Sequence, residues 1–229
     1  HNVYEWNDRQ IIKELFYPYG GHENIPSYEV TKKDSNWMRM YSLEASACRR
    51  IFRTEFLRKI NFSFPVGVKW EDVWQHFYTI HCAQRCIALQ DTGFIYRVNT
   101  SSQITSGGGV SRLDIAPVYS QALEEAMKNN WSREEMAYII DMFRDFAAWS
   151  VRVTNMDYMH ILLKDLHKAF CKIPKSRLRD ICYVCKRSKF ELGYIYILRS
   201  PFYCILADYR KRIKYKKLYA RLKKLLKRG

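Results

Sequence analysis

After the glycines Gly107 to Gly109, the sequence carries a helical pattern almost to its end. Apolar residues recur there at three- and four-residue spacing, which is typical of helices that bury one face. Ser132 followed by Glu135 predicts a capping box, in which each side chain satisfies a free amide at the helix start. The second half is therefore expected to be helical, with long helices near residues 114–129, 133–153, 157–171 and 176–198.

The first half has a mixed pattern. Pro18, Gly20 and Gly21 end one helical pattern, and Pro65 with Gly67 separates the next ones. Alternating apolar residues late in this half predict a pair of strands joined by a turn at 91–93. The predicted elements are helices at 7–17, 42–53, 55–59 and 71–84, a polar loop at 22–35, an extended piece at 62–64 and paired strands at 86–89 and 93–98.

The net charge of +16 is concentrated in a tail, because residues 210–229 hold eleven Lys and Arg and no acid. Removing these eleven charges leaves +5 for the rest of the chain, so the body is only mildly basic. Apolar residues of the tail repeat at helical spacing opposite the basic ones, which is typical of a helix lying on an anionic membrane surface. A solvated helix end is the plain alternative, and we expect no binding of nucleic acid.

The seven cysteines are an odd number without a regular framework, which favours reduced thiols in a cytoplasmic protein. The pairs Cys182/Cys185 and Cys82/Cys86 lack the second ligand pair that a zinc site needs, so buried thiols are expected. The longest apolar region, 192–207, is interrupted by Arg199, Ser200 and Pro201 and is too short to span a bilayer. Because the first residue is His1 rather than Met, we expect the chain to be a fragment.

Two adjacent acids, Glu71 and Asp72, open an aromatic-rich helix in the stretch Lys69-Trp70-Glu71-Asp72-Val73-Trp74. A carboxylate in the first turn is stabilised by the helix dipole, so simple helix capping is one interpretation. The other is that one acid accepts a proton from a substrate hydroxyl while nearby aromatic rings hold a sugar.

Four phrases follow one another in the chain: Arg49-Arg50-Ile51-Phe52, Ile60-Asn61-Phe62, Glu71-Asp72 and Tyr96-Arg97 with Ser102 and Thr105. Their order and spacing over residues 35–106 resemble bacterial family 2 glycosyltransferases of the GT-A fold. The resemblance implies inverting transfer of a sugar from a nucleotide-diphosphate donor to an acceptor hydroxyl in cell-surface polysaccharide synthesis. The acceptor would be a saccharide or a lipid-linked saccharide, and the enzyme would be peripheral at the inner face of the cell membrane.

The resemblance also assigns roles to residues. Asp72 matches the general base and Glu71 would support it, while Trp70 and Trp74 would border the acceptor. Arg97, Ser102 and Thr105 fall in a loop that closes near the donor phosphates, although a surface salt bridge explains Arg97 equally well. Among the other aromatic residues, Trp37 is the candidate for contact with the acceptor.

Three departures from the family pattern stand out. Cys48 replaces a frequent Trp, and Ser102-Gln103-Ile104-Thr105 is one residue longer than the usual phrase. The donor-binding half with its Asp-x-Asp motif is absent, so the ligands of the expected Mg or Mn ion lie outside this chain, and the isolated chain is expected to be inactive.

The expected fold is therefore α/β, a partial GT-A fold that is mostly helical here with a few short strands. Residues 1–110 would form the acceptor-side half of the catalytic domain, 111–200 a helical extension and 201–229 the membrane-surface tail. One alternative is a nonenzymatic helical binding or scaffold protein whose basic tail binds a membrane, a partner or nucleic acid. Another is a degenerate, inactive relative.

Overall fold

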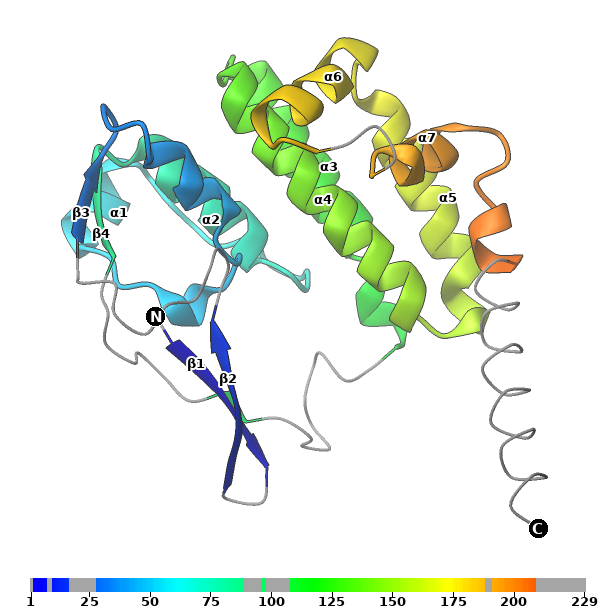
Figure 1. Ribbon diagram of the computed structural model, residues 1–229, viewed down its shortest axis with the longest axis horizontal. Coiled ribbons are helices and arrows are strands. Elements are labelled where there is room, and N and C mark those ends of the chain that lie inside the picture. Colours follow the sequence, from blue (N-terminus) through cyan, green and yellow to red (C-terminus); the bar gives the residue numbers. More distant parts are fainter. Residues whose placement is uncertain are drawn as a thin grey trace.

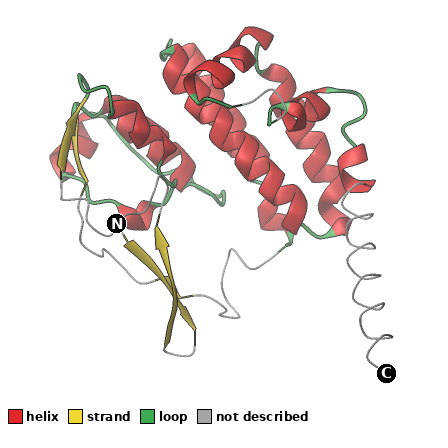
Figure 2. Ribbon diagram, viewed as in Figure 1, coloured by secondary structure: helices red, strands yellow, loops and turns green. Residues whose placement is uncertain are grey.

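The computed structural model describes residues 2–7, 10–16, 28–88, 96–97, 108–187 and 191–208, and these residues are predominantly helical. Figure 1 shows the order of the elements along the chain, and Figure 2 distinguishes the helices from the strands by colour. Within the described part, no helix is both long enough and apolar enough to cross a bilayer. The predicted basic tail, 210–229, lies outside the described residues.

Three of the long helices predicted for the second half are confirmed: α3 (Ile115–Lys128), α4 (Arg133–Val153) and α5 (Met156–Lys172). The capping box is confirmed as well. Ser132 Oγ accepts a hydrogen bond from the Glu135 amide at 3.1 Å, and Glu135 Oε2 accepts one from the Ser132 amide at 2.8 Å. These two bonds satisfy donors at the start of α4 that have no partner within the helix.

The fourth long helix, predicted over 176–198, is wrong as a single element. The chain forms α6 (Lys175–Val184) and α7 (Gly193–Arg199) instead. Lys186, just after the C-cap of α6, has a φ of 53°, a left-handed conformation that commonly ends helices.

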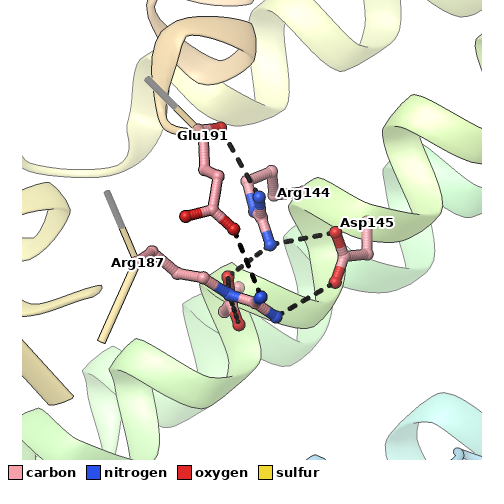
Figure 3. A network of polar contacts seen from close by, with 5 residues as sticks. Arg144, Asp145, Arg187 and Glu191 are labelled. Atoms are coloured by element: carbon pink, nitrogen blue, oxygen red, sulfur yellow. Dashed lines mark hydrogen bonds and ion pairs between the residues drawn. The ribbon is translucent and has the colours of Figure 1, made fainter. Parts of the chain in front are cut away.

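An ion-pair network attaches the connection between α6 and α7 to α4 (Figure 3). Arg144 Nη2 lies 2.8 Å from Asp141 Oδ1 and 2.9 Å from Asp145 Oδ1. Arg187 Nε lies 3.0 Å from Asp141 Oδ2, and its Nη1 lies 3.4 Å from Glu191 Oε1. Because Asp141 and Arg144 are buried, their charges depend on these partners.

The helix predicted over 7–17 is wrong. Its backbone forms β2 (Gln10–Phe16), which pairs antiparallel with β1 (Asn2–Asn7), and β5 (Tyr96–Arg97) pairs parallel with β1. The spacing of Ile11 and Ile12 fits a helix. Both residues are β-branched, however, and β-branched residues favour a strand once a partner strand is present.

A second, two-stranded sheet joins distant segments. β3 (Tyr28–Thr31) pairs antiparallel with β4 (Arg85–Ala88), so part of the predicted loop at 22–35 is a strand. The predicted pairing of 86–89 with 93–98 is also wrong, because β4 and β5 lie in different sheets. The predicted turn at 91–93 lies outside the described residues.

Helices α1 (Thr54–Lys59) and α2 (Asp72–Cys82) confirm the predictions for 55–59 and 71–84. The predicted helix over 42–53 is wrong, because only two short 3-10 turns form, η1 (Trp37–Ser42) and η2 (Ala47–Arg49). Arg50 donates to the Glu44 carbonyl at 3.2 Å and to the ring of His76 on α2, so its side chain attaches this segment to α2. Residues 62–64, predicted to be extended, belong to no strand.

One hydrophobic core includes residues from Val30 to Leu206 and so unites both halves of the chain. Tyr119 of α3 stacks on Phe143 of α4 at 4.8 Å, and Phe143 stacks on Phe170 of α5 at 4.3 Å. Tyr41 stacks on Phe77 of α2 at 6.4 Å. The ring of Phe77 therefore attaches α2 to the core.

Candidate active site at the start of α2

The loop that leads into α2 is held against the segment before α3. The Lys69 amide donates to Asp114 Oδ2 at 2.9 Å, and Trp70 Nε1 donates to the Ser111 carbonyl at 3.1 Å. Trp70 has a φ of 70°, an unfavourable conformation for a residue with a bulky side chain. Such backbone strain persists only where surrounding contacts impose it, and it is concentrated at functional sites.

The ring of Trp70 packs among aromatic residues and one buried cation. It meets the rings of Phe146 and Trp149 edge-on at 5.8 and 5.5 Å. The guanidinium of Arg112, from the short 3-10 turn η4 (Val110–Arg112), lies 5.3 Å from the Trp70 ring centre and 4.0 Å from that of Trp149. Arg112 is only 1% exposed, and burial lowers its pKa. The site therefore has a cation held beside its aromatic wall.

Asp72 is the first residue of α2 and is half-buried. Burial raises the pKa of its carboxyl to about 6, and the neighbouring charge of Glu71 adds to this effect. Its own amide and Arg50 oppose the rise. Glu71, the N-cap residue, is exposed, and its side chain makes no capping hydrogen bond. The Glu71 side chain therefore does not cap α2. The pKa of Asp72, at about 6, lies above the usual range of an aspartate.

A buried polar face follows Asp72 along α2. Gln75, His76 and Thr79 are all buried, although helix faces in a core are usually apolar. His76 Nε2 donates to the Tyr41 carbonyl at 3.0 Å, and its Nδ1 accepts from Arg50. Burial, followed by the charge of Arg50, holds the pKa of His76 well below its usual value, so the ring stays neutral.

Two buried polar groups near Asp72 have no hydrogen-bonding partner among the described residues. They are the side-chain amide of Gln75 and the hydroxyl of Tyr119. The pKa of Tyr119 is raised chiefly by burial and then by the charges of Asp72 and Asp145. Buried polar groups are rarely left without a partner in native proteins. Both side chains are 0% exposed, so these groups are enclosed by the protein.

Sequence reasoning missed Arg50, Gln75, His76 and Tyr119 as members of this site. A signal for two of them was present: Asp72, Gln75, His76 and Thr79 are spaced as i, i+3, i+4 and i+7, which places four polar residues on one face of a helix. Arg50 and Tyr119 carry no such signal, because only the packing of η2 and α3 against α2 brings them near.

The structure separates the two tryptophans predicted to border the acceptor. Trp74 lies two positions after Asp72, and therefore on another side of α2, where it stacks on Tyr78 at 4.8 Å and lies 6.4 Å from Trp131. Trp37 lies in the core and is 3% exposed. Burial leaves little of the Trp37 ring exposed for contact with a sugar.

The remaining predicted residues are placed only in part. The backbone of Arg97 pairs with that of Trp6 in the sheet, whereas Ser102 and Thr105 lie outside the described residues. No three His, Cys, Asp or Glu side chains within the described ranges are placed to hold a metal ion. All seven cysteines are free thiols, and Cys182 and Cys185 are half-buried.

Comparisons of this chain with protein-family models, with curated proteins and with solved structures find no match.

Proposed function

We propose that this chain is the acceptor-side part of an inverting glycosyltransferase of the GT-A fold, with Asp72 as the general base. The observation that supports the proposal best is the state of Asp72: a half-buried carboxyl at a helix start, beside a strained tryptophan, with a pKa raised to about 6. A general base works best when its pKa lies near the pH at which the enzyme operates.

The proposed reaction is a single displacement. The acceptor hydroxyl oxygen attacks the anomeric carbon of the donor, and its proton passes to a carboxylate oxygen of Asp72. The bond between the anomeric carbon and the diphosphate oxygen breaks, and the nucleoside diphosphate leaves with the electron pair. Asp72 then releases the proton to water.

The surroundings of Asp72 suit this role. Partial burial removes water that would otherwise stabilise the carboxylate, so the carboxylate becomes a stronger base. The donor, its cation and the residues that select the sugar would come from outside the described residues.

The test compares two matched variants of the full-length protein. We expect Asp72→Asn to lower transfer from a nucleotide-sugar by about 10²–10⁴-fold, the usual contribution of a general base, with donor binding nearly unchanged. Asp157→Asn, which alters an exposed acid in the first turn of α5, is the control. If the rate of sugar transfer by Asp72→Asn equals that of the control, Asp72 is not the general base and the proposal is refuted.

A further inference from the structure

A pocket of about 330 Å³ lies between the first two turns of α6 and the end of α7. Leu178 forms part of its apolar wall. The lining residues are Lys175, Leu178 and Arg179 from α6, and Tyr196, Arg199 and Ser200 at the end of α7. Three of these six side chains are cationic and none is acidic. We call this the α6–α7 pocket.

The cations of the pocket have no acidic partner in the described part of the chain. Neither Lys175 nor Arg179 makes an ion pair there. The nearby acid Asp180 is already bound, to Arg133 at 2.5 Å and to Arg177 at 3.7 Å. The α6–α7 pocket therefore carries uncompensated positive charge, which favours an anion.

Arg199 is fixed in position before any ligand arrives. Its Nη1 donates to the carbonyls of Phe170, at 2.5 Å, and of Ile173, where α5 ends. The guanidinium is planar and has five N–H donors, so one nitrogen can hold α5 while the others remain available. A fixed guanidinium beside two further cations is the arrangement that recognises phosphate oxygens.

Exposed apolar side chains lie next to the pocket in sequence. Phe202 is 75% exposed and Ile205 is 56% exposed. The residue that follows each of them is anchored: Tyr203 stacks on His167 of α5 at 4.4 Å, and Leu206 is buried in the core. Tyr203 and Leu206 therefore attach the segment to the protein, while Phe202 and Ile205 extend into solvent. Figure 1 shows this segment leaving α7 and running beside α5.

We propose that the α6–α7 pocket and the side chains of Phe202 and Ile205 form a docking site for an anionic phospholipid surface. A headgroup phosphate occupies the pocket, and the two apolar side chains enter the boundary of the acyl layer. A membrane surface provides phosphate and apolar surface side by side. A soluble phosphate compound would explain the cations but would leave Phe202 and Ile205 exposed to water. The eleven basic residues of 210–229 follow directly in the sequence and add charge of the same sign.

The proposal does not depend on sugar transfer, and it is tested on the full chain. Co-sedimentation is measured with vesicles of phosphatidylcholine alone and of phosphatidylcholine mixed with phosphatidylglycerol. We expect binding only to the mixed vesicles, weakened about 10–30-fold in the double variant Lys175→Gln/Arg179→Gln. The control Arg58→Gln/Lys59→Gln removes the same charge from exposed positions on α1 and should bind like the unaltered chain. Equal binding by the pocket variant and its control would overturn the proposal.

The apolar part of the site has its own pair of variants. Phe202→Ser/Ile205→Ser should weaken binding to the mixed vesicles about tenfold or more, because about 0.8 kcal/mol is lost for each buried methylene group. Ile51→Ser/Val66→Ser, which alters two side chains that are also highly exposed, should have no effect. Unchanged binding by the Phe202/Ile205 variant would reduce the contact to charge alone and refute the proposed docking.

A third arm separates a lipid from a free phosphate compound. Inorganic phosphate and glycerol phosphate are titrated into the chain, and chemical shifts are followed by NMR. Weak binding of either compound, with strong binding to mixed vesicles, supports the proposal. Tight binding of the soluble phosphate without vesicle binding would assign the pocket to a soluble ligand and overturn it. Thermal unfolding of each variant checks that the fold is retained.

Discussion

The hydroxyl of Tyr41 donates a hydrogen bond to Glu135 Oε1 at 2.5 Å, although the two residues are 94 positions apart. The same carboxylate accepts from His81 Nδ1 at 2.8 Å and from the Ser132 amide at 2.8 Å. Burial alone would raise the pKa of Glu135, but the hydrogen bonds from His81, Tyr41 and Ser132 outweigh it and lower the pKa to about 2. The residue that caps α4 thus also connects the helical half to η1 and α2.

Removing the hydroxyl of Tyr41 should weaken this connection. We expect Tyr41→Phe to lower the free energy of unfolding by about 1.5–3 kcal/mol, the usual value of a hydrogen bond to a charged group. The measurement is urea denaturation followed by circular dichroism. Tyr183→Phe, at a side chain that is 90% exposed, is the control and should change little. Equal effects of the two variants would show that the bond contributes nothing to stability.

The depressed pKa of Glu135 makes its contribution to stability dependent on pH. A carboxyl whose pKa is lower in the folded state stabilises the fold above its unfolded pKa, near 4.5, and loses that contribution as the pH falls toward 2. The stability difference between the unaltered chain and Glu135→Gln should therefore be largest above pH 4.5 and shrink toward pH 2. Denaturation at several pH values measures it. A stability difference that stays constant with pH would contradict the hydrogen bonds that lower the pKa of Glu135.

Asp72 should show the opposite behaviour. Because its folded pKa is raised from 3.8 to about 6, ionisation costs stability as the pH rises between these two values. We expect Asp72→Asn to stabilise the protein by about 1–2 kcal/mol at neutral pH, and to have no effect below pH 3.8. Asp157→Asn is the control. A loss of stability in Asp72→Asn at neutral pH would mean that the ionised carboxylate is favoured by its surroundings.

The rate of sugar transfer should follow the ionisation of Asp72. In the full-length protein, kcat/KM is expected to rise with pH and to level off above an inflection near pH 6, because the base must be ionised before it accepts a proton. Initial rates over a series of buffers give the profile. An inflection that persists in the residual activity of Asp72→Asn would assign it to another group.

The ion-pair network of Figure 3 should contribute strongly to stability. Asp141→Asn removes the charge that Arg144 and Arg187 both contact, although both cations keep Asp145 as a partner. The free energy of unfolding should therefore fall by more than about 1 kcal/mol, but by less than the roughly 3–5 kcal/mol lost when a buried charge is left with no partner. Asp165→Asn breaks an ion pair with Lys168 at 3.9 Å on the surface of α5 and should cost less than about 1 kcal/mol. Similar costs for the two substitutions, measured by denaturation, would show that the network is not buried in solution.

Sequence patterns alone predict the elements whose stabilising contacts are local. The periodic patterns of α3, α4 and α5, the capping box of Ser132 and Glu135, and the short helix α1 are all encoded within a few turns of chain. The sequence also identifies Glu71 and Asp72 at a helix start, because a polar pair before an apolar helical pattern is a local signal.

Other elements depend on partners far away in the chain, and they are set by tertiary contacts. Residues 10–16 become a strand because β1 pairs with them, and β4 pairs with β3 rather than with its neighbour in sequence. Arg50 and Tyr119 come close to Asp72 through tertiary packing, which local sequence patterns do not predict. The raised pKa of Asp72 has the same origin, since burial, the largest cause of the shift, results from the folding of the whole chain around the start of α2.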